Sequence, residues 1–101
     1  MTAPNATVWR HVSTPGSGDI VFISSSNSFG THAISGGGYA NGHDGTNASS
    51  TDEGGNDVSA ACPLVASFPS YDAGTDTTYW VVGFMAPPGC SLRAHVFAIL
   101  A

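Results

Sequence analysis

One stretch of the chain reads Thr77-Thr78-Tyr79-Trp80-Val81-Val82-Gly83-Phe84-Met85, with apolar or aromatic side chains at both odd and even positions. A second run of this kind, Ser91–Leu100, follows the turn signal Pro87-Pro88-Gly89. β-Branched and aromatic residues favour strands, so we expect the two runs to form an antiparallel hairpin. A strand that is apolar on both faces is either central and covered twice, or has its outer face on a partner.

Alternating runs elsewhere in the chain, separated by clusters of Gly, Pro, Asn, Asp and Ser, predict further strands. The six predicted strands span residues 7–12, 19–24, 32–40, 58–68, 77–86 and 91–100. No segment of useful length has a helical period. We therefore predict an all-β fold, a single small β-sandwich or jelly-roll-like domain of about six antiparallel strands over residues 1–101. Residues 1–7 are expected to form an extended N-terminal arm.

Residues 41–57 are predicted to form a long polar loop, because they include no large apolar side chain. The loop holds four of the seven acidic residues, and a loop of this length is usually either functional or mobile. Carboxylates are ligands for Ca²⁺, but no calcium-loop pattern is present, so we expect no metal and no cofactor. Tyr39 follows three glycines that permit a bulge or the close approach of another backbone. The candidate ligand or surface residues are Tyr39, Asp44, Asp52, Glu53, Asp57 and Trp80.

Cys62 and Cys90 leave two alternatives open. They could form one disulfide that closes a loop of about 28 residues. They could equally be two thiols, because Cys62 alternates in phase with Val58, Leu64 and Phe68, which we expect to point inward. A buried cysteine behaves as a small hydrophobe.

The charge of the chain excludes several classes of partner. Charged residues make up 9% of the chain, and only Arg10 and Arg93 are basic, which gives a net charge of −5. Such a chain has no cationic surface for nucleic-acid phosphates or for an anionic membrane. Its hydrophobic fraction of 42% argues against disorder. Low charge outside the acidic loop favours a domain covered by neighbours over a free monomer.

The sequence predicts no catalytic site. No serine has the Gly-x-Ser-x-Gly frame, and the four histidines lack zinc-ligand spacing. The N-terminus has no secretory signal pattern, so either a signal has been removed or the protein is made and used without export. One alternative from another class is a carbohydrate-binding module, in which exposed aromatics such as Trp80 and Tyr39 would form a stacking platform.

Two segments carry a family resemblance. The stretch from Phe29 to Gly38 and the C-terminal stretch from Ala94 to Ala101 resemble small exported β-sandwich domains of high-GC Gram-positive bacteria. In those domains the resemblance implies a bridge between two cysteines, whose positions are taken here by Asn27 and Leu100. The absence of both partners favours a related domain that folds and assembles in the cytosol.

The composition, rich in Gly, Ser, Thr and Ala, resembles that of small phage head-decoration and other minor virion proteins. That resemblance implies a structural, non-enzymatic virion protein that contacts a major capsid protein or copies of itself. The alternative is an exported, extracellular module that binds carbohydrate or a surface. The predicted interface consists of apolar residues on the outer faces of the last two strands: Tyr79, Val81, Met85, Phe97 and Ile99.

Overall fold

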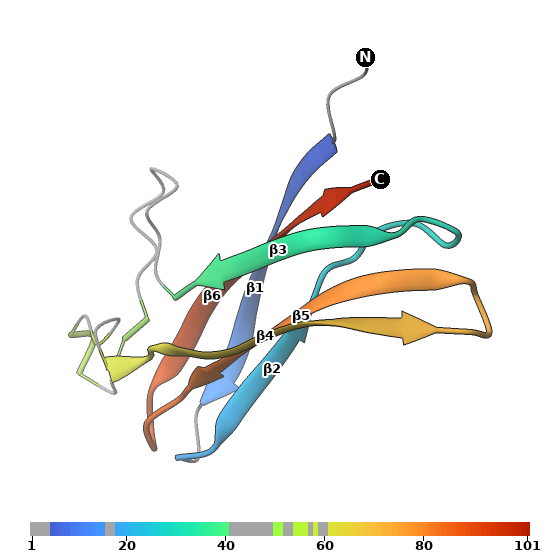
Figure 1. The fold of residues 1–101 in the computed structure, drawn as a ribbon. Coiled ribbons are helices and arrows are strands. Elements are labelled where there is room, and N and C mark those ends of the chain that lie inside the picture. Colours follow the sequence, from blue (N-terminus) through green and yellow to red (C-terminus); the bar gives the residue numbers. More distant parts are fainter. Residues whose placement is uncertain (1–4, 16–17, 41–49, 52–53, 57, 59–60) are drawn as a thin grey trace.

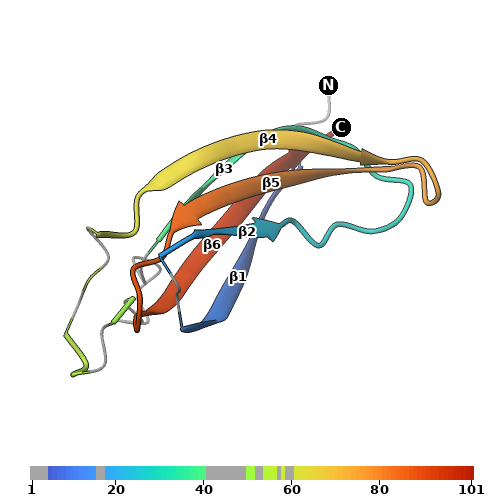
Figure 2. The same ribbon diagram turned by 90° about the horizontal axis from the view of Figure 1, so that it is seen from below.

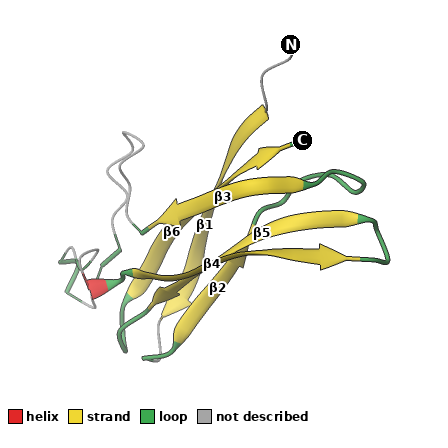
Figure 3. Ribbon diagram, in the orientation of Figure 1, coloured by secondary structure: helices red, strands yellow, loops and turns green. Residues whose placement is uncertain are grey.

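In the part of the chain that it describes, the computed structural model contains six strands (Figure 1). They are β1 (Asn5–Pro15), β2 (Ile20–Ser24), β3 (Ala33–Tyr39), β4 (Leu64–Asp72), β5 (Thr77–Met85) and β6 (Ser91–Leu100). The structure describes residues 5–15, 18–40, 50–51, 54–56, 58 and 61–101, with side chains in β1 described only for residues 7–9. A short 3-10 turn at Ala61 precedes β4 (Figure 3).

The strands form two antiparallel three-stranded sheets. Sheet A has the order β1-β6-β3 and sheet B has the order β2-β5-β4. The two sheets lie in separate layers (Figure 2). Every connection crosses between the sheets except the β4–β5 hairpin. The predicted all-β sandwich is thus confirmed.

The predicted hairpin between the last two strands is wrong, because β5 and β6 are the central strands of different sheets. The end of β5 pairs with the start of β2: the amide of Ala86 donates to Asp19 O at 3.3 Å, and the amide of Gly18 donates to Ala86 O at 2.9 Å. Pro87 and Pro88 then offer no N–H group for a continued ladder. The central positions of β5 and β6 explain why both strands are apolar on both faces.

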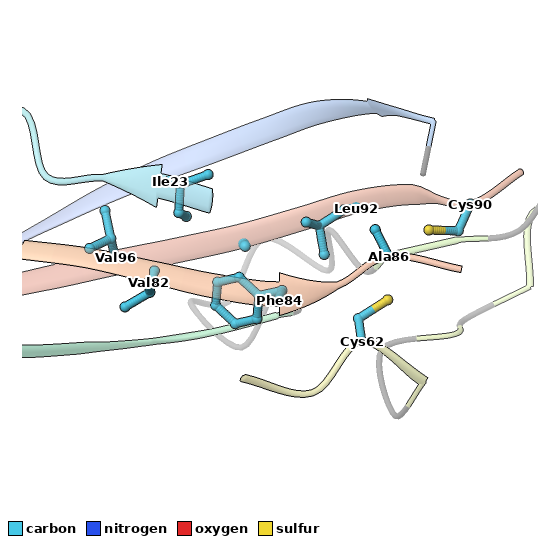
Figure 4. Close-up of a cluster of buried hydrophobic side chains, with 9 residues drawn as sticks. Ile23, Cys62, Val82, Phe84, Ala86, Cys90, Leu92 and Val96 are labelled. Atoms are coloured by element: carbon cyan, nitrogen blue, oxygen red, sulfur yellow. The ribbon is translucent and has the colours of Figure 1, made fainter. Parts of the chain in front are cut away.

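The core lies between the sheets and is made by the inward side chains of the two central strands (Figure 4). Phe84 and Leu92 are completely buried there, and each such side chain contributes roughly 1.5–3 kcal/mol relative to an exposed one. The core cluster comprises Ile23, Cys62, Val82, Phe84, Ala86, Cys90, Leu92, Ala94 and Val96.

Three consecutive glycines in β3 let neighbouring groups approach the backbone closely. A Cβ at Gly36 would lie 2.4 Å from Trp80 Cγ, and one at Gly38 would lie 3.1 Å from Val82 Cγ2. Both contacts come from sheet B. A Cβ at Gly37 would instead meet the ring of Phe97 at 2.7 Å. The predicted close approach of another backbone is also present, because a Cβ at Gly36 or Gly38 would lie 2.5 Å from the carbonyl oxygen of Phe97 or His95, respectively, in β6.

The fourth strand begins later than its predicted range of 58–68. Cys62 is buried as expected, but Leu64 and Phe68, expected to point inward with it, are exposed. The alternation fails because β4 starts only after Pro63 and its register with β5 shifts between Leu64 and Ala66. The strand also continues through Pro69, which an edge strand tolerates because its missing N–H would face away from the sheet.

A buried hydrogen-bond network fixes the crossover from β2 to β3. Ser25 Oγ donates to Asn27 Oδ1 at 2.7 Å and accepts from the amide of Trp80 at 2.8 Å. Asn27 Nδ2 donates to Thr31 Oγ1 at 2.9 Å and to Thr78 O at 3.1 Å. Asn27, at a position where the resemblance implies a cysteine, thus anchors the crossover to β5.

The predicted arm and loop are described only in part. Residues 5–7 belong to β1 and pair with β6, from Asn5 opposite Leu100 onward, and residues 1–4 lie outside the described part. Within 41–57, the buried Ser50 accepts a bond from the amide of Arg93 at 2.9 Å, and Thr51 forms a bridge with Ser91. The two residues thereby extend sheet A where β3 no longer pairs with β6.

Candidate functional site

The outer face of sheet B gathers apolar side chains from all three of its strands. The register places Ile20 opposite Met85, Phe22 opposite Gly83, and Phe68 opposite Val81. Directly opposed residues share a face, and this face is the one turned away from the buried Val82 and Phe84. We name it the sheet B face and define it as Ile20, Phe22, Phe68, Tyr79, Val81, Gly83 and Met85.

An aromatic pair forms the middle of the sheet B face. The rings of Phe22 and Phe68 meet edge to face, with centroids 6.3 Å apart and an interplanar angle of 68°. Phe22 comes from one edge strand and Phe68 from the other, so the pair spans the central strand at Gly83. A Cβ at Gly83 would lie 2.9 Å from both Phe22 Cε1 and Ile20 Cγ2. Glycine at this position thus lets the ring of Phe22 lie against the sheet.

These side chains remain substantially exposed. Phe22 is 55% exposed, and Phe68 and Ile20 are 42% exposed. With roughly 200 Å² for a fully exposed phenylalanine, the two rings present about 200 Å² of apolar surface. The residues that define the sheet B face include no ionisable side chain other than the phenol of Tyr79, and the register places Ser24, Ser70 and, at the far end of β4, Asp72 on the same side. An apolar, aromatic centre without formal charge is the composition of an interface core.

The outer face of sheet A is apolar as well. Val8 lies opposite Phe97, and both are exposed, while Ile99 is half-buried on the same side. Further along, the ring of Tyr39 stacks on the buried His95 at 4.6 Å. The five predicted interface residues therefore divide between opposite surfaces: Tyr79, Val81 and Met85 lie on sheet B, and Phe97 and Ile99 lie on sheet A.

The predicted ligand surface is not brought together. Trp80 packs its ring between the sheets against Gly36, and its Nε1 donates to Ser67 Oγ at 2.8 Å. Tyr39 lies on the outer face of sheet A, so these two aromatics form no common platform. The four acidic candidates, Asp44, Asp52, Glu53 and Asp57, lie outside the described residues.

A polar cluster at the β4–β5 turn was not predicted from the sequence. His32 Nδ1 lies 2.8 Å from Thr78 Oγ1, and His32 Nε2 lies 3.6 Å from Asp76 Oδ1. Tyr71 stacks on His32 at 6.2 Å and donates its hydroxyl to Asp76 Oδ1 at 2.8 Å. No local pattern signals the cluster, because its members are brought together only by the fold.

The chemistry of this polar cluster favours a structural role. The hydrogen bond to Asp76 raises the pKa of Tyr71, because the bond requires the protonated phenol. The side chains of His32 and Asp76 are 40% and 70% exposed, and ion pairs that solvent reaches contribute little. Polar groups gain catalytic strength where water is excluded, and water reaches this cluster. The arrangement is therefore suited to holding the β4–β5 hairpin in place.

Cys62 and Cys90 are both buried, and no disulfide joins them in the structure. Elsewhere in the described part of the chain, no group of three or more His, Cys, Asp or Glu side chains is placed to hold a metal ion. No helix among the described residues is long and apolar enough to cross a membrane.

Comparisons with protein families, curated proteins and solved structures give no match.

Proposed function

We propose that this chain is a non-enzymatic structural protein that docks onto a larger protein assembly through the sheet B face. The exposed Phe22–Phe68 pair, seated over Gly83, carries the proposal. Aromatic side chains are enriched among the residues that dominate binding energy, and covering about 200 Å² of ring surface favours docking by about 5 kcal/mol before the costs of association. Val81 and Met85 extend the same contact surface along β5.

A second apolar surface supports a bridging role. Val8 and Phe97 are exposed on sheet A, on the opposite side of the sandwich from the Phe22–Phe68 pair. A domain with apolar patches on both outer faces can contact two neighbours at once. Contacts that are individually weak then reinforce one another through effective concentration.

We propose, as the specific form of this role, a decoration or cement protein of a phage capsid, located in the virion. Its partners would be the major capsid protein and neighbouring copies of itself. The compositional resemblance to minor virion proteins and the 9% charged residues support this form. A carbohydrate-binding platform that joins Trp80 and Tyr39 has no support, because the two side chains lie on different parts of the molecule; the carbohydrate-binding alternative otherwise stays a prediction.

The test expresses tagged chains in bacterial cells that produce the phage capsid and separates the cell extract by gradient sedimentation. The chain with Phe22→Thr and Phe68→Thr should leave the fraction of capsid-sized particles and remain near the top of the gradient. Threonine retains strand propensity, so circular dichroism should stay unchanged. Phe29→Thr is the matched control, because Phe29 is 74% exposed at a turn outside both sheets.

Two results would contradict the proposal. One is a wild-type chain found entirely at monomer size in those cells. The other is a folded double variant that sediments with particles as the wild type does.

A further inference from the structure

Cys62 and Cys90 lie together at one end of the core. Both are buried and both belong to the cluster that includes Ala86. Figure 4 shows both side chains at the same end of the cluster, next to Ala86. Cys62 is separated from the sheet B strand β4 only by Pro63, whereas Cys90 directly precedes the sheet A strand β6.

The backbone explains this proximity. The amide of Met85 donates to Pro63 O at 3.1 Å, which places Cys62 beside Ala86 on the neighbouring chain segment. The amide of Cys90 donates to Pro87 O at 3.2 Å and closes a tight turn. Such a turn brings its first and last Cα atoms within about 7 Å. A disulfide needs Cα atoms separated by about 4.4–6.8 Å, and the tight turn folds Cys90 back toward the segment that lies beside Cys62.

We propose that Cys62 and Cys90 are a disulfide site, which closes when the protein meets an oxidised low-molecular-weight disulfide such as glutathione disulfide. The thiolate of one cysteine attacks a sulfur of glutathione disulfide, which releases one glutathione thiolate. The second cysteine thiolate then attacks the protein sulfur of the mixed disulfide and releases the other glutathione. Two electrons pass to glutathione disulfide, and the two thiol protons are taken up by the two glutathione products.

The bond would connect the two sheets covalently. It would close a loop of about 28 residues that contains the β4–β5 hairpin. Closing a loop of this length lowers the conformational entropy of the unfolded chain and should decrease the ratio of unfolded to folded protein several hundred-fold. Because both thiols are buried, exchange requires a local opening or takes place before folding is complete. The redox state of the pair would therefore record the compartment in which the chain folds.

The test refolds the purified chain from denaturant in a glutathione buffer that contains the oxidised form. The product is then denatured, treated with iodoacetamide and weighed by mass spectrometry. We expect a monomer that has lost two hydrogen atoms and takes up no alkyl group, with a melting temperature at least about 10 °C above that of the reduced chain. Cys62→Ala and Cys90→Ala, treated in the same way, should show neither the mass loss nor the rise.

The proposal is overturned if the wild-type chain remains alkylated at both cysteines after refolding in this buffer. A chain linked only to glutathione, or only to a second copy, would overturn it as well. So would an internally bridged chain that melts no higher than the reduced one.

Discussion

The glycines of β3 offer a graded test of the packing between the sheets. A Cβ at Gly36 would lie 2.4 Å from Trp80 Cγ and 2.5 Å from the carbonyl oxygen of Phe97. Neither group can withdraw easily, because the ring lies between the sheets and the carbonyl is part of β6. Overpacking costs about 1–3 kcal/mol, and with two such obstacles we expect Gly36→Ala to lower the free energy of unfolding by about 3 kcal/mol.

Two other glycines calibrate this estimate. A Cβ at Gly37 meets the ring of Phe97, which is partly exposed and can swing toward solvent, so Gly37→Ala should cost about 1 kcal/mol or less. A Cβ at Gly74 meets only the side chain of Asp72 at 3.3 Å, so Gly74→Ala should be nearly neutral. Urea unfolding followed by tryptophan fluorescence measures all three variants. A Gly36→Ala chain within about 0.5 kcal/mol of the wild type, or one less affected than Gly37→Ala, would refute the described packing of Trp80.

Two further predictions concern the polar contacts. Replacing Asn27 by Ala removes a buried amide and deprives Ser25 and Thr31 of a hydrogen-bond partner. The free energy of unfolding, measured by urea titration, should therefore fall by about 2–3 kcal/mol. A decrease below about 0.5 kcal/mol would contradict the network. Replacing Asp76 by Asn should lower the pKa of Tyr71, as measured by ultraviolet titration with Tyr71→Phe to assign the signal, and an unchanged titration would contradict the bond. The folded-state pKa of Tyr71 is raised above its unfolded value near 10. The hydrogen bond between Tyr71 and Asp76 therefore stabilises the fold fully below pH 10, and this stabilisation disappears as the pH rises through the folded-state pKa. The free energy of unfolding of Tyr71→Phe should lack this decrease with pH.

The strands could be predicted from the sequence because apolar and β-branched residues alternate within them, but their pairing could not. Pro87-Pro88-Gly89 is compatible both with a hairpin and with a crossing between sheets. Long-range pairing of Ala86 with Asp19 determines the outcome, and no local pattern reports it. The inward set around Cys62 failed for a related reason, because a register shift after Leu64 interrupts the alternation.

The candidate site could be predicted only as far as β5 extends. The alternation of that strand places Tyr79, Val81 and Met85 together on one face. Because the other face is apolar as well, one of the two faces was expected to contact a partner. Phe22 and Phe68 escaped the sequence argument, since they come from edge strands whose partner and register were unknown. Gly83 offered the one available signal, because a glycine inside an apolar strand often marks a close approach by another group.

Docking through the sheet B face can be examined by hydroxyl-radical footprinting of the chain, free in solution and within purified particles. The proposal predicts that labelling of Phe22, Phe68 and Met85 falls strongly in the particle, while Phe29 is labelled equally in both states. Labelling of Phe22 and Phe68 that is the same in the free chain and in the particle would contradict it.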